Sequence, residues 1–248
     1  MPIERVIVNT RPDFDVATLY AGYWVGVTLR LLEERGLRVT DLLGDLATLE
    51  NLTMALNTFD PIIFWGEGHG NETKFSGQNA IIMLEKGVNE YLFVGRIVHL
   101  TSCLTGALGG LLESIVNAGA IASIGYSVDF IVGIDTPNFP VGDPTNKATQ
   151  SFLEPDCQIE ISLAEGKTIA EAIMDSTVKS DAWIEYWRKS GNPDTDILIM
   201  ALISNRDYKV VYGVPGVVSR LVAEPLSPII ALASVAQLLG LGLVIIKW

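Results

Sequence analysis

Short apolar runs recur along this chain and are mostly separated by longer amphipathic segments. The runs contain many β-branched residues and end at glycine, proline or other turn-forming residues, which is typical of strands buried in a parallel sheet. We therefore predict strands at residues 4–10, 61–65, 96–102, 121–128, 196–203 and 209–213.

The amphipathic segments have apolar residues three and four positions apart, the spacing of a helix with one buried face. They predict helices at residues 17–36, 42–59, 79–88, 104–120, 156–166 and 169–191. The alternation of strands and helices indicates right-handed crossovers, with helices covering both faces of a mostly parallel sheet. We expect one α/β domain at residues 1–222, built as a three-layer sandwich, with a long loop at residues 133–150.

The C-terminal tail, residues 225–248, carries no charge before Lys247. Its apolar run, Ile229–Ile246, predicts a helix about 27 Å long, which matches the hydrocarbon thickness of a bilayer. Lys247 and Trp248 would then lie at the membrane interface. We expect membrane contact through residues 229–246; a buried helix and a hydrophobic partner-binding segment are the alternatives.

Composition excludes several classes of function. Acidic residues outnumber basic ones by 29 to 17, giving a net charge of -12, so a basic surface for nucleic acid is not expected. Two cysteines and two histidines occur without the spacing of a metal site, so we expect no metal and no disulfide framework. We also expect no cofactor, because Asn71 stands where a dinucleotide fingerprint needs glycine and no phosphate-binding loop is present.

The first ten residues lack the basic region and the cleavage site of a signal peptide. The expected location is therefore a membrane surface, reached through the C-terminal anchor, or otherwise the cytoplasm. The sequence does not predict the oligomeric state.

Two rare side chains follow two of the predicted strands. His69 lies between glycines after the strand at 61–65, and Cys103 follows the strand at 96–102. Reactive groups gather at the carboxyl ends of strands in open parallel sheets. If the two strands are neighbours, their ends lie about 5 Å apart, and a base and a thiol can meet there.

The surroundings of Cys103 favour a reactive thiol. A helix predicted directly after it would place the sulfur at the positive end of a helix dipole, which favours the thiolate. Gly70 has no β-carbon, so its N–H can approach a substrate carbonyl and, with the N–H of Cys103, form an oxyanion hole. By contrast, His99 lies inside its strand and is expected to be structural, and Cys157 is expected to serve only packing.

The segments "GEGHGNET", "HLTSCLTG" and "NAGAIASIGYSVDF" resemble the clan CD cysteine peptidases, which share the caspase–gingipain–separase fold. "GHGNET" and "KVVYGVPG" are most similar to gingipain-like peptidases, whereas "CLTG" and "ISLAEGKTIAEAI" are closer to CHAT domains. The resemblance extends over residues 4–216. It implies a caspase-like fold and hydrolysis of a protein or peptide substrate by a Cys103 thiolate, with His69 protonating the leaving amine and Gly70 helping to bind the oxyanion.

The same resemblance implies a pocket for the side chain before the cut bond, the P1 residue. Its candidates are Asp13, Asp15, Glu67, Tyr126, Ser127 and Asp129. An acidic pocket would select arginine or lysine. The match departs from CHAT domains and separases at two positions: they typically have tryptophan in place of Tyr126, and their acid falls where this chain has Phe130.

Three functions remain open at this point. The first is a cysteine endopeptidase, which the presence of both Cys103 and His69 favours. The second is a non-catalytic binding or assembly module that works through its hydrophobic tail. The third is a peptidase held inactive by the tail or by the loop at 135–150. No residue is predicted to orient His69.

Overall fold

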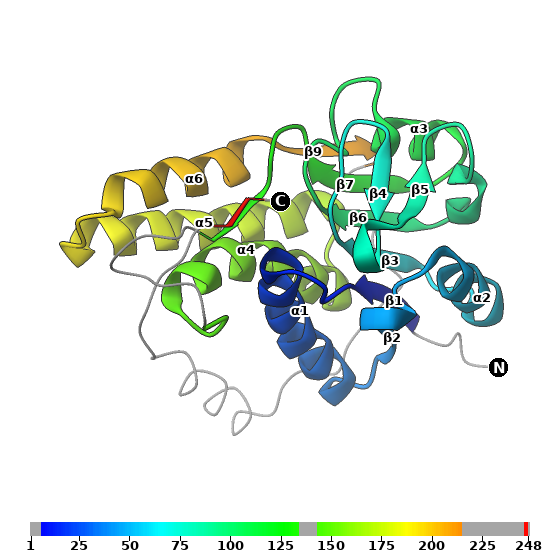
Figure 1. Ribbon diagram of the computed structural model, residues 1–248, viewed down its shortest axis with the longest axis horizontal. Coiled ribbons are helices and arrows are strands. Elements are labelled where there is room, and N and C mark those ends of the chain that lie inside the picture. The colour runs from blue at the N-terminus through cyan, green and yellow to red at the C-terminus, as the bar shows by residue number, and fades with distance from the viewer. Residues whose placement is uncertain (1–5, 134–142, 215–245, 248) are drawn as a thin grey trace.

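The computed structural model describes residues 6–133, 143–214 and 246–247. Six strands form the central sheet in the order β2-β1-β3-β6-β7-β9, and all neighbouring pairs are parallel except the antiparallel pair β7–β9 (Figure 1). These strands are β1 Val6–Arg11, β2 Arg38–Leu43, β3 Ile63–Glu67, β6 Ile97–Thr101, β7 Ala122–Tyr126 and β9 Lys209–Gly213.

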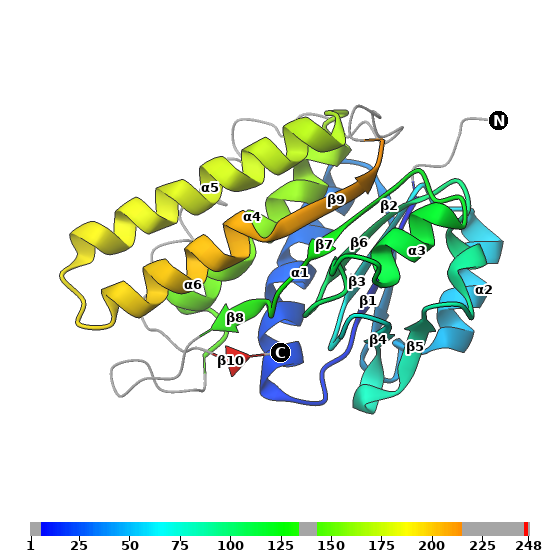
Figure 2. The same ribbon diagram turned by 90° about the horizontal axis from the view of Figure 1, so that it is seen from above.

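Helices cover both faces of this sheet, as Figure 2 shows from above. One face packs against α1 (Val16–Glu34), α4 (Lys147–Ala164) and α5 (Ile169–Ser190). The other face packs against α2 (Leu49–Phe59) and α3 (Leu111–Asn117). The last helix, α6 (Thr195–Asp207), pairs with α5. The predicted three-layer α/β sandwich with a mostly parallel sheet is confirmed.

Smaller elements complete the described chain. A hairpin is formed by β4 (Lys74–Ser76) and β5 (Ile82–Glu85), and a separate antiparallel pair is formed by β8 (Ile131–Gly133) and β10 (Ile246–Lys247). Three 3₁₀ turns lie at Gly44–Leu46, Gln78–Ala80 and Glu90–Phe93.

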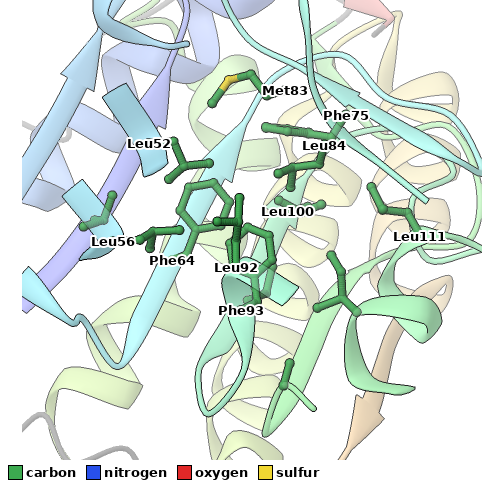
Figure 3. Close-up of a cluster of buried hydrophobic side chains, with 14 of the residues drawn as sticks. Leu52, Leu56, Phe64, Phe75, Met83, Leu84, Leu92, Phe93, Leu100 and Leu111 are labelled. Carbon is green, nitrogen blue, oxygen red and sulfur yellow. The ribbon is translucent and has the colours of Figure 1, made fainter. Parts of the chain in front are cut away.

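The alternation of side chains along the strands separates two apolar cores. On the α2 and α3 side, Phe64, Val98 and Leu100 are fully buried, and they join the cluster drawn in Figure 3 with Leu52 and Leu56 of α2. On the opposite face, their strand neighbours pack against α4 and α5. Strands buried on both faces in this way explain the unbroken apolar runs of the sequence.

Two predicted elements are of the wrong type. The helix predicted at 79–88 is instead a 3₁₀ turn followed by β5, because Asn79 and Ala80 have positive φ, which an α-helix does not accommodate. The strand predicted at 196–203 lies within α6. There Leu198, Ala201 and Leu202 are buried while Met200 is exposed, and this three-and-four spacing belongs to a helix.

Most of the predicted membrane helix, residues 229–245, lies outside the described residues. Its last residue, Ile246, is in strand β10 rather than in a helix. Among the helices of residues 6–133 and 143–214, none combines the length and apolarity needed to cross a membrane.

Candidate functional site

Three chemically active side chains lie beyond the carboxyl ends of three adjacent strands. Asp15 follows β1, His69 follows β3 and Cys103 follows β6. Because the sheet order places β3 between β1 and β6, all three segments lie at the same edge. The predicted neighbourhood of the strands before His69 and Cys103 is thus confirmed by the parallel β3–β6 pairing.

His69 is paired with a carboxylate that the sequence did not reveal as its partner. Its Nε2 lies 2.6 Å from Oδ2 of Asp15, and both side chains are about one-third exposed, at 30% and 36%. The ring of Phe14 lies against the imidazole at 5.6 Å between centroids. This pair fixes the orientation of the imidazole, which is the role of the third group in a catalytic triad.

Asp15 is itself fixed by the start of α1. It is the N-cap of that helix, and its Oδ1 accepts a hydrogen bond of 2.9 Å from the N–H of Thr18. Partial burial raises the pKa of Asp15, but the hydrogen bond from Thr18 and the contact with His69 outweigh burial and leave that pKa below its usual value. Asp15 is therefore a carboxylate at neutral pH.

The glycine after His69 brings the two halves of the site into contact. A β-carbon added at Gly70 would lie 2.9 Å from the carbonyl oxygen of Cys103, a distance that real β-carbons essentially never show, and 3.0 Å from Oγ of Ser102, which is tighter than most real β-carbon contacts. Glycine is therefore required here for the close approach of two backbones. The segment carrying His69 consequently lies directly against the segment carrying Cys103.

Cys103 is held in a strained loop rather than at the start of a helix. The residue after it, Leu104, has a φ of 59°, and α3 begins only at Leu111. The predicted effect of a helix dipole on the thiol is therefore wrong. The loop is held by the N–H of Leu104, which donates to the carbonyl of Val128 at 3.0 Å. Positive φ at a non-glycine residue beside a candidate nucleophile is a feature of functional sites.

The sulfur of Cys103 faces the connection between β7 and β8. Its Sγ lies 3.9 Å from the carbonyl oxygen of Phe130, and the residue is 2% exposed. Phe130 packs against Tyr126 with 4.4 Å between ring centroids. The residues just before β8 therefore form one wall beside the candidate nucleophile.

The residues predicted to select the P1 side chain lie in different environments. Asp13 is exposed and accepts a hydrogen bond of 2.9 Å from Gln78, whereas Ser127 donates to the carbonyl of Tyr208 at 3.2 Å. Tyr126 is buried and donates to Asp156, and Asp129 is exposed one residue before Phe130. As a P1 pocket this set stays a prediction.

Glu67 lies at the end of β3 with no exposed surface. Neither carboxylate oxygen has a hydrogen-bond partner among the described residues. Burial raises the pKa of Glu67 well above its usual value, which favours the protonated form.

A pocket of about 200 Å³ opens beside His69, on the side of the β4–β5 hairpin. It is lined by His69, Gly70, Asn71, Lys74, Ser76, Ala80 and Ile82. Apart from His69 and Gly70, these residues were not predicted to take part in the site, since nothing in a short polar loop reveals which side chains a hairpin folds inward.

Behind the site, the sheet and α4 enclose a buried polar network. His99 lies 2.7 Å from Glu160 and 3.3 Å from Asp156, with all three side chains at least 98% buried. Burial lowers the pKa of His99, but the two carboxylates outweigh burial and raise that pKa to about 10. The structural role predicted for His99 agrees with this position. Asp156 also accepts a 2.7 Å hydrogen bond from Thr101, two residues before Cys103.

The second cysteine has a different environment. Cys157 lies in α4 and is buried, and burial raises the pKa of its thiol well above the usual value. A thiol of this kind is inert, which agrees with the packing role predicted for it. Among residues 6–133 and 143–214, no group of side chains has the composition of a metal site.

Comparison with solved structures identifies the fold. The chain is similar to the Arg-specific cysteine proteinase gingipain R, with a TM-score of 0.55 and 13% identity over 89% of this chain and 48% of that one. It is also similar to the complex of the Porphyromonas gingivalis RgpB pro- and mature domains, with a TM-score of 0.52, 13% identity and coverage of 89% and 49%. A third structure, described as a protease, gives a TM-score of 0.53 and 15% identity, with coverage of 88% and 49%.

The chain thus has the fold of gingipain-type cysteine peptidases of clan CD, the caspase-like α/β fold that the sequence predicted. It spans about half the length of each of these chains. No family model matches the sequence, and no curated protein matches it.

Proposed function

We propose that this protein is a cysteine endopeptidase in which Cys103 is the nucleophile, His69 the general acid and base, and Asp15 the residue that orients His69. The observation that carries the proposal is the 2.6 Å contact between His69 and Asp15, directly beside the Cys103 loop. The shared fold with gingipain-type proteinases supports the same assignment.

The geometry supports an acyl-transfer mechanism. The Cys103 thiolate attacks the carbonyl carbon of the substrate, and the N–H groups of Gly70 and Cys103 stabilise the oxyanion that forms. His69 then gives a proton to the leaving amine, and water cleaves the resulting thioester with His69 as base. Because Asp15 holds Nε2 of His69, Nδ1 is the nitrogen assigned to these proton transfers.

Replacing Asp15 with asparagine is expected to lower kcat by about 10²-fold. Asparagine is as good an N-cap as aspartate, so α1 keeps its capping bond to Thr18 while His69 loses a charged partner. Peptide hydrolysis and the melting temperature are measured together for D15N and for D196N, which changes an exposed aspartate of α6 outside the site. Equal activity in D15N and the wild type, at equal stability, would contradict the assignment of Asp15.

We further propose a preference for a basic P1 side chain. Asp129 supports it, because this exposed carboxylate lies one residue before Phe130, whose carbonyl contacts Cys103. Gingipain R is described as Arg-specific. A peptide library in which aspartate or a bulky apolar residue at P1 is cleaved faster than arginine or lysine would contradict this preference.

Membrane attachment through residues 229–246 is the remaining part of the proposal. It is supported by the absence of charge from residue 225 to residue 246. The full chain is expected to float with phosphatidylcholine vesicles in a density gradient, whereas a chain ending at residue 224 stays at the bottom. Equal sedimentation of both chains would rule out attachment through the tail.

A further inference from the structure

The strand that follows the wall beside Cys103 is paired with the far end of the same chain. Ile246 and Lys247 form β10, which pairs antiparallel with β8, with Ile246 opposite Gly133 and Lys247 opposite Ile131. Figure 2 shows β10, drawn in red, beside β8. A segment far away in the sequence therefore returns to the region of the candidate site.

β8 is well placed to receive such a segment. The side-chain amide of Asn205 holds β8 onto α6, donating to the carbonyl of Ile131 at 2.6 Å and accepting from its N–H at 3.0 Å. Val132 is buried in the cluster that contains Ala17 and Phe130. β8 is thus fixed between α6 and the start of α1, and its backbone presents a rigid template for one more strand.

β8 lies next to the candidate nucleophile. Phe130, the residue before β8, contacts Sγ of Cys103. On the other side, Ala17 of α1 lies two residues after Asp15. A chain paired with β8 therefore lies along the strand that begins directly after Phe130 and near α1, the helix that Asp15 caps. Cys103 is only 2% exposed in this structure, so a peptide reaches the sulfur only after the surrounding chain moves.

We propose that the edge of β8 is a docking site for an extended peptide segment, and that the C-terminal residues Ile246 and Lys247 of the same chain occupy it. Docked there, they compete with any other extended peptide for the approach to Cys103. The competition takes the form of autoinhibition if the chain is a peptidase, and in that respect the inference rests on the proposed function.

Docking of the C-terminus also opposes attachment to a membrane. A helix from Ile229 to Ile246 is about 27 Å long, so it would carry Lys247 to the far side of a bilayer and away from β8. Insertion of the tail and pairing of β10 with β8 therefore exclude one another, and vesicles that bind the tail are expected to release the edge of β8.

The test uses the full chain with proline in place of Ile246. Proline has no N–H to donate, and its ring fixes φ at about −65°, away from the extended value of a strand in an antiparallel pair. The control is Ser234→Pro, which places the same residue in the same tail but outside β10. Neither residue belongs to the catalytic groups assigned above.

Two readouts are compared in the wild type, I246P and S234P. Hydrogen exchange at residues 132–133 is expected to be about tenfold faster in I246P only, because this part of β8 loses the paired strand, whereas the N–H of Ile131 stays bound to Asn205. Alkylation of Cys103 by iodoacetamide is also expected to be about tenfold faster in I246P, with buried Cys157 as the internal reference. A synthetic peptide with the sequence of residues 244–248 should slow both rates again.

Equal exchange in I246P and S234P would overturn the docking of β10 on β8. Faster exchange with unchanged alkylation of Cys103 would overturn the competition at the site. Neither readout needs peptide hydrolysis, so failure of the proposed function, seen as no turnover by any form, is distinguished from failure of this inference.

Discussion

Replacing Cys103 with alanine is expected to reduce peptide hydrolysis by about 10³-fold or more. The sulfur is the atom that forms the thioester, and removal of a nucleophile leaves only the contributions of binding and of the oxyanion hole. Hydrolysis of an arginyl peptide substrate is measured for the purified full chain and for C103A. Because the Cys103 side chain is small and buried, the substitution is expected to leave the fold intact.

The second cysteine supplies a matched control. Cys157 is also buried, but it lies in α4, so C157A changes packing by the same number of atoms without touching the site. Retention of activity in C157A together with its loss in C103A assigns the chemistry to one thiol. Comparable activity in both variants would remove Cys103 from the mechanism.

Replacing His99 with leucine is expected to lower the free energy of unfolding by about 3–5 kcal/mol. The imidazolium lies between Glu160 and Asp156 with no exposed surface. Leucine carries no charge and cannot donate a hydrogen bond. Both carboxyl groups would therefore remain buried beside an apolar side chain. Urea unfolding followed by circular dichroism measures the loss.

The matched variant replaces all three members of this network, as H99L with D156N and E160Q. Asparagine and glutamine carry no charge, so the triple variant is expected to recover most of the free energy of unfolding that H99L loses. Replacing a whole buried network destabilises a protein less than removing one member and leaving its charged partners buried. A stability of H99L equal to that of the wild type would contradict the charged network.

The same network predicts how stability depends on pH. The pKa of His99 is about 10 in the folded chain and 6.5 as the ordinary value, so the folded state binds the proton more tightly. The contribution of protonated His99 to the free energy of unfolding is therefore full below about pH 6.5 and is lost as the pH rises toward 10. The wild type is expected to lose stability over this range, and H99L is expected to lose less.

The sequence revealed the parts of the site that depend on the order of strands. Apolar runs predicted β3 and β6, and turn-forming residues after them marked where reactive side chains of a parallel sheet gather. This was sufficient to place His69 and Cys103 at one edge. The role of Asp15 was not visible, because an N-cap aspartate has the same local pattern whether or not a histidine from another strand reaches it.

The errors in secondary structure have a similar cause. Residues 79–88 contain apolar residues at spacings that fit a helix, but the burial of Met83 and Leu84 in the core of Figure 3 is decided by pairing with β4. The apolar run at 196–203 has the local pattern of a strand, but packing of one side against α5 makes it a helix. In both cases tertiary contacts decide between two local structures of similar propensity.

The buried network was also beyond sequence reasoning. His99, Asp156 and Glu160 come from β6 and α4, and nothing in either segment indicates that the two face each other. The nearest signal was the four-residue spacing of Asp156 and Glu160, which places both on one face of a helix.

The central claim is that Cys103 is a nucleophile activated by His69, and labelling with a peptidyl chloromethyl ketone tests it most directly. The intact protein is treated with an arginyl and, separately, with an aspartyl reagent, and the modified residue is located by mass spectrometry in the wild type, C103A and H69A. We predict labelling at Cys103 by the arginyl reagent, absent in C103A and strongly reduced in H69A. Unmodified Cys103 in the wild type and in I246P, with both reagents, would contradict the account.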